Sequence, residues 1–229
     1  MTGNSPPEFD RHASEYEAQL RESMSAAFAE DRYFAEYKVL YMARRLGDAV
    51  PARLLDFGCG IGRSLELLRA LFPRTELWGY DVSGESIRVA VERLPGARLT
   101  SDLDSLPAGF DVVFAANVFH HIPAAERRTA LEKCAQLLAE GGRIFIFEHN
   151  PLNPVTRWVF ERCPFDEHAV MLSRRETQDL AAAAGLRVAG SGYTLFFPRP
   201  LSWLRFAEPL LAWLPLGAQY CVELRKIKQ

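Results

Sequence analysis

A glycine-rich turn between a strand-like run and a helix-like run is the feature that most constrains the fold. The mostly apolar residues at 54–57 lead into Gly58 and Gly60, and the next apolar run along the chain ends in Asp81. Glycines after a first strand let a ligand lie against bare backbone, and an acid at the tip of the neighbouring strand accepts hydrogen bonds from ribose hydroxyls. The sequence therefore predicts a ligand that contains a nucleoside.

The spacing of the glycines argues against two common nucleotide loops. A dinucleotide fingerprint carries G-x-G-x-x-G, and its third glycine packs the helix on the strand. Here the glycines are Gly58, Gly60 and Gly62, and Arg63 stands where the third fingerprint glycine would be. A P-loop also needs Gly-Lys-Ser/Thr after the turn, and none follows. The turn is therefore poorly suited to a pyrophosphate.

The run from Leu55 to Gly62, L-D-F-G-C-G-I-G, resembles the first motif of the class I S-adenosylmethionine-dependent methyltransferases, which is close to L-D-x-G-C-G-x-G. The resemblance covers about two fifths of the chain, residues 53–149. It implies S-adenosylmethionine as cofactor and S-adenosylhomocysteine as product. It also implies a Rossmann-like sheet of seven mostly parallel strands, the last of them antiparallel, and methyl transfer by in-line attack on the sulfonium methyl.

Alternating segments along the chain predict the same α/β fold, with helices on both faces of the sheet. Gly141 and Gly142 are expected to end one helix, and Ser173 with Glu176 forms a capping-box pattern at the start of another. The expected strands are 53–57, 75–81, 97–101, 110–116, 143–148, 186–196 and 218–226, and the expected helices are 12–46, 62–71, 84–93, 124–139 and 174–184.

Two segments exceed what this fold needs, and they shape the predicted domain organisation. Residues 1–50 are expected to form a helical cap or lid, and 51–229 the cofactor-binding domain. Within that domain, 150–172 and 198–216 read as insertions, which are usually functional when they are this long. We expect them to roof the active site, because concave apolar sites form where such caps meet a sheet. The alternative is that they cover sheet edges or form a dimer contact.

Four cofactor contacts are expected around the glycine turn besides its glycines. Asp81 is the best candidate, because its two oxygens match two vicinal hydroxyls, and Val82 after it would pack on adenine. Cys59 lies inside the turn. Asp56 ends the first strand, where it either reaches the cofactor's amino group through water or caps the amides of its own loop.

Further contacts are implied by the resemblance alone. An acid four residues before a Leu-Pro pair accepts from the adenine amine in this family, and the next amide contacts the ring, which maps to Asp102 and Leu103. Asp104 competes for the first role, and either acid is otherwise an ordinary turn acid. Asn117, after the fourth strand, should lie near the sulfonium. The F-D-x-x-A-x-x-Y opening maps Tyr16 to closure over the methionine end.

Two histidines are the candidate general bases, and a base is needed only if the acceptor carries a proton of high pKa. His121 matches the histidine of the family's motif after the fourth strand, and His149 follows the fifth strand at the edge where parallel sheets bind ligands. Either residue is otherwise structural. We predict no metal, because His149, Cys163 and His168 have no regular ligand spacing.

Charge and cysteine usage narrow the partners and the compartment. The formal net charge of −2 gives no basic stripe for nucleic acid. The four cysteines are scattered without a C-x-x-C pair, which favours a reducing compartment, and we expect the cytoplasm. The oligomeric state stays open, with a homodimer as one alternative.

The insertions favour a small apolar or amphipathic methyl acceptor. They carry every tryptophan except Trp78. One alternative is a partner subunit or sensor that binds the cofactor without turnover. Another is a peripheral membrane enzyme acting on a lipid-linked substrate, with 198–216 lying on the bilayer. For that reading, Arg199 and Arg205 suit an interface, whereas Glu208 and the prolines weaken a regular amphipathic helix.

Overall fold

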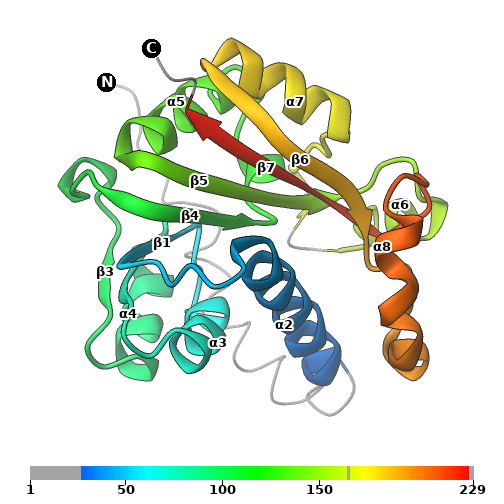
Figure 1. Ribbon diagram of the computed structural model, residues 1–229, viewed down its shortest axis with the longest axis horizontal. Helices are drawn as coiled ribbons and strands as arrows, with labels where there is room; N and C mark the ends of the chain where they lie inside the picture. Colours follow the sequence, from blue (N-terminus) through cyan, green and yellow to red (C-terminus); the bar gives the residue numbers. More distant parts are fainter. Residues whose placement is uncertain (1–26, 164–165, 227–229) are drawn as a thin grey trace. The chain divides into compact units, whose positions relative to one another are not determined.

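The computed structural model describes residues 27–163 and 166–226, and these contain one seven-stranded sheet with the order β3-β2-β1-β4-β5-β7-β6 (Figure 1). β2 and β3 are parallel, as are β4 and β5, whereas β7 runs antiparallel to both β5 and β6. The predicted Rossmann-like sheet with an antiparallel last strand is therefore confirmed. The strands are β1 (Arg53–Phe57), β2 (Glu76–Tyr80), β3 (Arg98–Thr100), β4 (Phe110–Ala116), β5 (Leu138–His149), β6 (Leu186–Thr194) and β7 (Gln219–Lys226).

The described chain divides into two compact units, the first of which comprises residues 27–50 and 55–106. Its helices are α2 (Ala27–Leu46), α3 (Arg63–Leu71), α4 (Gly84–Arg93) and the short η1 (Leu103–Ser105). α3 buries Leu65 and Leu68, and α4 buries Val89 and Ala90, so each helix turns one apolar stripe inward. The Ser83 side chain accepts from the Ser86 amide and caps the start of α4.

The second unit comprises residues 51–54 and 107–226, apart from the undescribed 164–165. Its helices are η2 (Phe119–His121), α5 (Arg127–Leu137), α6 (Pro154–Phe160), α7 (Arg174–Ala183), η4 (Arg199–Ala207) and α8 (Glu208–Leu211). α5 and α7 pack on each other and on the strands β5, β6 and β7 (Figure 1). The capping box of Ser173 and Glu176 is confirmed at the start of α7.

The expected role of Gly141 and Gly142 as the end of a helix is wrong. α5 already ends at Leu137, and β5 begins at the next residue, so both glycines lie within the strand segment. A Cβ on Gly142 would lie 2.8 Å from the Phe110 carbonyl oxygen, so this position needs glycine because two backbones approach closely.

The two insertions are hydrogen-bonded to each other at the ends of β5 and β7. The Asn150 side chain donates to the Pro215 and Gly217 carbonyls at 3.1 and 2.8 Å, and Asn153 donates to the Leu216 carbonyl at 2.7 Å. Thr156 donates to the Ala218 carbonyl at 3.1 Å. The expected boundary at residue 50 stays a prediction. Among the described residues, no helix is both long and apolar enough to cross a membrane.

Candidate functional site

In the first unit, the glycine turn and Asp81 lie together as the sequence predicts. One Asp81 carboxylate oxygen accepts from the Gly60 amide at 2.7 Å, and the other accepts from the Ser83 amide at 2.9 Å. The Gly58 amide donates to the Tyr80 carbonyl at 2.7 Å, which ties the turn to the end of β2. Each carboxylate oxygen has a second lone pair, so Asp81 keeps acceptor capacity for a ligand.

The turn leaves open space at the glycine where a ligand is expected. Gly58 and Gly60 have φ of 77° and 51°, a left-handed backbone that glycine adopts without steric cost. A Cβ on Gly60 would have nothing within 4 Å, whereas a Cβ on Gly62 would meet the Leu94 side chain at 2.8 Å. Gly60 therefore faces open space, and Gly62 is needed for helix packing.

Asp56 lies at the end of β1 with 2% of its surface exposed, and its Oδ2 has no hydrogen-bond partner among the described residues. Burial raises the pKa of this carboxyl to about 8, the nearby Asp81 carboxylate adds to the effect, and Lys38 opposes it. At neutral pH the buried group is therefore mostly protonated. A neutral acid with an unused oxygen fits the predicted contact with a ligand through water, since it can donate to or accept from a bridging water.

Replacing Asp56 with asparagine is expected to alter the pH dependence of stability. The folded-state pKa of about 8 lies above the ordinary value of 3.8, so the folded chain retains a proton that the unfolded chain releases. Between about pH 7 and pH 9 this group should cost the native chain about 1 kcal/mol of unfolding free energy, and Asp56→Asn should abolish that loss. Urea unfolding at both pH values measures it. Equal losses in the two proteins would contradict the assignment.

The other predicted cofactor residues differ in what surrounds them. Asp102 is exposed and accepts from the Asp104 amide at 3.0 Å, so it already acts as the cap of η1, which Leu103 opens. The Cys59 side chain is buried, and burial raises the pKa of its thiol well above the usual value. Val82 is 57% exposed next to Asp81, as a residue that stacks on a ligand would be. Tyr16 lies outside the described residues.

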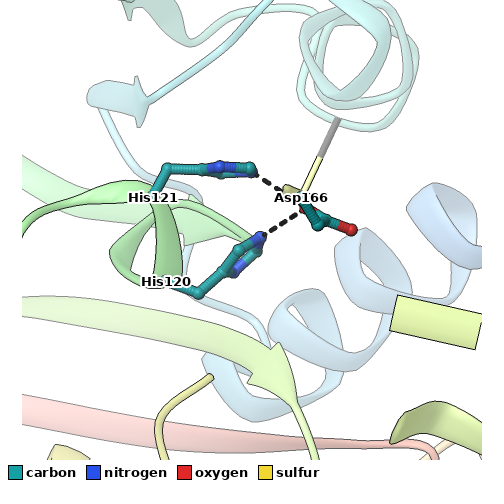
Figure 2. Close-up of side chains that lie close together, drawn as sticks. All are labelled: His120, His121 and Asp166. Carbon is teal, nitrogen blue, oxygen red and sulfur yellow. Dashed lines mark ion pairs between the residues drawn. The ribbon is translucent and has the colours of Figure 1, made fainter. Parts of the chain in front are cut away.

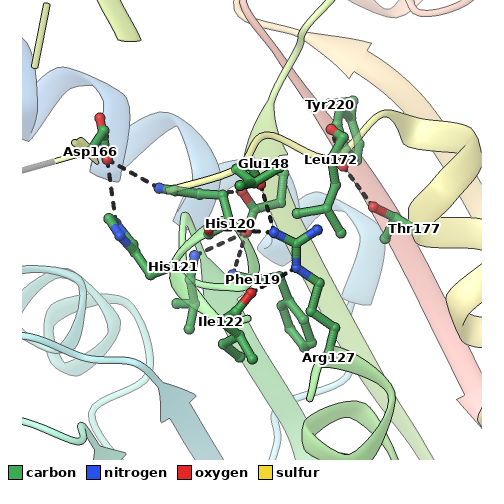
Figure 3. Close-up of polar contacts among 12 residues, drawn as sticks. Phe119, His120, His121, Ile122, Arg127, Glu148, Asp166, Leu172, Thr177 and Tyr220 are labelled. Atoms are coloured by element: carbon green, nitrogen blue, oxygen red, sulfur yellow. Dashed lines mark hydrogen bonds and ion pairs between the residues drawn. The ribbon is translucent and has the colours of Figure 1, made fainter. Parts of the chain in front are cut away.

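In the second unit, the loop after β4 is organised by Glu148 at the end of β5. Its Oε1 accepts from the Val118 and Phe119 amides at 3.0 and 2.7 Å, and its Oε2 pairs with His120 Nδ1 at 2.5 Å (Figure 3). Asn117 begins this loop with φ of 59°, and its buried Oδ1 has no hydrogen-bond partner among the described residues. A strained residue with an unused polar atom at a strand end fits the predicted ligand contact.

Arg127 holds the same loop from α5. Its guanidinium donates to the Ile122 carbonyl at 2.9 Å and to the Val170 carbonyl at 2.7 Å (Figure 3). The loop is thus fixed at one end by a buried carboxylate and at the other by a guanidinium.

Asp166 joins the two adjacent histidines of this loop. Its Oδ1 lies 3.4 Å from Nε2 of both His120 and His121 (Figure 2). Burial lowers the pKa of His120, but the carboxylates of Glu148 and Asp166 outweigh burial and raise it to about 9. Burial and the neighbouring charge of His120 lower the pKa of His121 to about 4. At neutral pH His120 is therefore protonated on both ring nitrogens and positively charged, whereas His121 is neutral.

These three side chains are also the group that could ligate a cation within the described ranges. The ligand atoms of His120, His121 and Asp166 all lie within 4.8 Å of one another. This set differs from His149, Cys163 and His168, which the sequence analysis considered as ligands and set aside because of their irregular spacing. A metal would have to displace the proton of His120, because a metal-bound imidazole nitrogen carries no proton.

His149 lies beside this network at the end of β5. Its ring centroid is 5.2 Å from that of His120 and 5.7 Å from that of Phe160 in α6. Phe160, Cys163 and Asp166 line a cavity of about 440 Å³. The structure therefore brings His121 and His149 into one cluster around His120. The sequence did not point to the pairing of His120 with Glu148. It did not point to Asp166 either, which belongs to no motif and lies at least 45 positions after His120 and His121.

The comparison with known families agrees with the motifs. Residues 55–144 match a family model described as a methyltransferase domain. The chain is 31% identical over 164 residues to the ubiquinone/menaquinone biosynthesis C-methyltransferase UbiE of Syntrophotalea carbinolica, covering 69% of this chain and 66% of that one. It is 37% identical over 93 residues to trans-aconitate 2-methyltransferase of Afipia carboxidovorans, covering 39% and 36%. The chain thus spans about a third to two thirds of the curated relatives it matches.

Solved structures support the fold. A TehB-like S-adenosylmethionine-dependent methyltransferase from Corynebacterium glutamicum superposes with a TM-score of 0.61 at 17% identity, covering 97% of this chain and all of that one. Magnesium protoporphyrin IX methyltransferase from Synechocystis, solved with bound S-adenosylhomocysteine, gives 0.57 at 17% identity, covering 87% and 84%. With the glycine motif, the strand order and these matches, the chain belongs to the class I S-adenosylmethionine-dependent methyltransferases.

Proposed function

We propose that this chain transfers the methyl group of S-adenosylmethionine to a small apolar or amphipathic acceptor. The observation that carries the proposal is the hydrogen-bonded pair of Asp81 and the Gly60 turn, with open space above Gly60. Bound there, S-adenosylmethionine would supply an electrophilic methyl group that an acceptor atom would attack in line with the departing sulfur, giving a neutral thioether. The protein supplies mainly alignment, which is worth about 7–11 kcal/mol in well-oriented reactions.

The relatives support carbon or oxygen as the acceptor atom. Their names specify trans-aconitate, a C-methylated quinone precursor and malonyl-[acyl-carrier protein] O-methylation. A hydroxyl or acidic C–H acceptor must lose a proton, whereas a carboxylate acceptor needs no base. The quinone-biosynthesis relative supports an acceptor with a larger apolar portion than trans-aconitate, such as a phenol or a quinone precursor.

His149 is the better of the two predicted bases under this proposal. It follows β5, at the edge where ligands bind in parallel sheets, and its side chain is partly exposed. His121 is neutral at pH 7, but its pKa of about 4 makes it a weak base, and its Nε2 already faces Asp166 at 3.4 Å. We assign the proton transfer to His149 and the positioning of the loop to His121.

Replacing His149 with glutamine is expected to lower kcat about a hundredfold, the lower range for loss of a general base. Affinity for S-adenosylmethionine should stay unchanged, and the rate of the variant should recover at high pH, where a phenolic acceptor ionises unaided. The matched variant His121→Gln should lower kcat less than about tenfold. Release of S-adenosylhomocysteine across a pH series measures both. A full rate in His149→Gln would remove this residue from the mechanism.

The proposal includes the surroundings of the site. Residues 1–50 would act as a lid and the insertions 150–172 and 198–216 as the roof that selects the acceptor. The cysteines Cys59, Cys134, Cys163 and Cys221 all carry free thiols, which supports a reducing compartment and hence the cytoplasm.

Calorimetric titration with S-adenosylmethionine and S-adenosylhomocysteine, with NADH as the competing nucleotide, tests the cofactor. A methyl-transfer screen over phenols, quinone precursors and dicarboxylic acids then tests the reaction. Binding of both sulfur cofactors with turnover of one class supports the proposal. Preference for NADH would overturn it, and cofactor binding without turnover on any class would favour a non-catalytic sensor or partner subunit.

A further inference from the structure

In the segment that contains η4 and α8, large apolar side chains are exposed and an acidic side chain is buried. Trp203 and Phe206 in η4, Leu210 in α8 and Trp213 just after α8 are 69 to 77% exposed. Glu208 points the other way: it is 4% exposed and accepts from the Leu195 and Phe196 amides, both at 3.2 Å. Glu208, the single acid of 198–216, therefore makes its hydrogen bonds inside the protein, and the exposed face formed by the four residues above is apolar.

Helix α6 shows the same arrangement. Its inward residue is Thr156, which is 8% exposed and donates to the Ala218 carbonyl. Four apolar residues in or just before this helix are each more than half exposed: Leu152, Val155, Trp158 and Val159. Because Asn153 donates to the Leu216 carbonyl, α6 is fastened to the end of the 198–216 segment, and both helices lie at the same end of β7 (Figure 1). We call these exposed side chains, with Leu216, the apolar end surface.

Basic groups accompany the apolar end surface. Arg199 is exposed at the start of η4, and the Arg162 guanidinium lies 4.5 Å from the centre of the Trp158 ring. The exposed acid Glu161 is paired with Arg157 at 3.7 Å. Residues 154–162 and 198–216 hold four arginines and two glutamates, and one of these glutamates, Glu208, is buried. Tryptophan, aliphatic side chains and arginine together are typical of segments that lie at the surface of anionic membranes.

We propose that the apolar end surface docks this protein on an anionic lipid bilayer. Soluble monomers rarely expose a contiguous apolar patch of this kind, so an occupant is required. A second copy is the weaker candidate, because an isologous dimer would bring together two copies of the same arginine-containing surface. Docking brings α6, whose Phe160 contacts His149, to the lipid, so amphiphilic acceptors would reach the candidate site from the bilayer.

Vesicle binding without cofactor or acceptor tests this inference independently of the proposed methyl transfer. Three of the four tryptophans, Trp158, Trp203 and Trp213, belong to the surface, so intrinsic fluorescence reports docking directly. With mixed phosphatidylcholine and phosphatidylglycerol vesicles we expect a blue shift, quenching by brominated acyl chains, and co-sedimentation that weakens in high salt. Phe206→Ser combined with Leu210→Ser should weaken binding at least about tenfold.

The control variant replaces two apolar residues that lie outside the apolar end surface and are also more than half exposed. Val50→Ser combined with Val91→Ser should bind vesicles as the unmodified chain does, and circular dichroism confirms that both variants fold. Equal binding by the two double variants, or no vesicle binding by the unmodified chain, would overturn the proposal. A concentration-dependent dimer in sedimentation velocity that Phe206→Ser with Leu210→Ser abolishes, without vesicle binding, would assign the surface to a second copy instead.

Discussion

Replacing Asp81 with alanine is expected to weaken the binding of S-adenosylmethionine about a thousandfold. Two charge-assisted hydrogen bonds to the ribose hydroxyls, at about 2 kcal/mol each, account for an effect of this size. The same change removes the acceptors of the Gly60 and Ser83 amides, at 2.7 and 2.9 Å, so the turn loses its support together with its ligand contact. Calorimetric titration measures the loss directly.

Two further variants separate ligand contact from loop support. Asp81→Asn keeps one carbonyl oxygen for the Gly60 amide but has no second acceptor, so we expect it to bind between the unmodified chain and the alanine variant. Glu85→Ala removes a nearby acid of α4 that pairs with Arg88 at 2.6 Å, and it should leave affinity unchanged. Affinity in Asp81→Ala within a fewfold of the unmodified chain would exclude this residue from the cofactor site.

The sheet was predictable from the sequence because its signals are local. The strands and the glycine turn around Gly58 depend on apolar runs and on residues a few positions apart, and α7 depends on its own capping box. The start of β5 was not predictable in this way. Gly142 is set by the approach of the Phe110 carbonyl, a residue from another strand, and no local pattern records such an approach.

The candidate site was predictable only in part, for the same reason. Asp81 was found because an acid at a strand tip is a local signal, whereas the partner of His120 lies 28 positions away at the end of β5. At Glu208 the local sequence pattern is itself misleading. In the sequence this residue breaks an apolar face, but the structure turns it inward to cap the end of β6, which leaves that face intact.

Replacing Glu148 with alanine is expected to lower the free energy of unfolding by about 3–5 kcal/mol near neutral pH. Glu148 is 1% exposed, and its removal leaves the Val118 and Phe119 amides without their acceptor and the protonated His120 without its nearest counter-charge. Burial raises the pKa of Glu148, but His120 and the hydrogen bonds to the carboxylate lower it below the ordinary value, so the group is ionised at neutral pH. Chemical denaturation monitored by circular dichroism measures the change.

The stability that this pair supplies should depend on pH with a defined sign. The pKa of His120 rises from 6.5 to about 9 on folding, so its contribution is full below about pH 6.5 and is lost as pH rises through about 9. The stability gap between the unmodified chain and Glu148→Gln should therefore shrink by about 2 kcal/mol between about pH 7 and pH 10. His121, with its pKa lowered to about 4, acts in the opposite range and costs stability on acidification.

A second buried glutamate provides the control for this pH dependence. Glu223 in β7 is 3% exposed and lies 3.6 and 3.5 Å from the guanidinium groups of Arg143 and Arg225. Arginine keeps its charge throughout this range, so the gap between the unmodified chain and Glu223→Gln should stay constant from about pH 7 to pH 10. A gap for Glu148→Gln that stays equally constant would mean that His120 is neutral in the folded chain. Both adjacent histidines would then be neutral, and the positive charge assigned to His120 would have to be withdrawn.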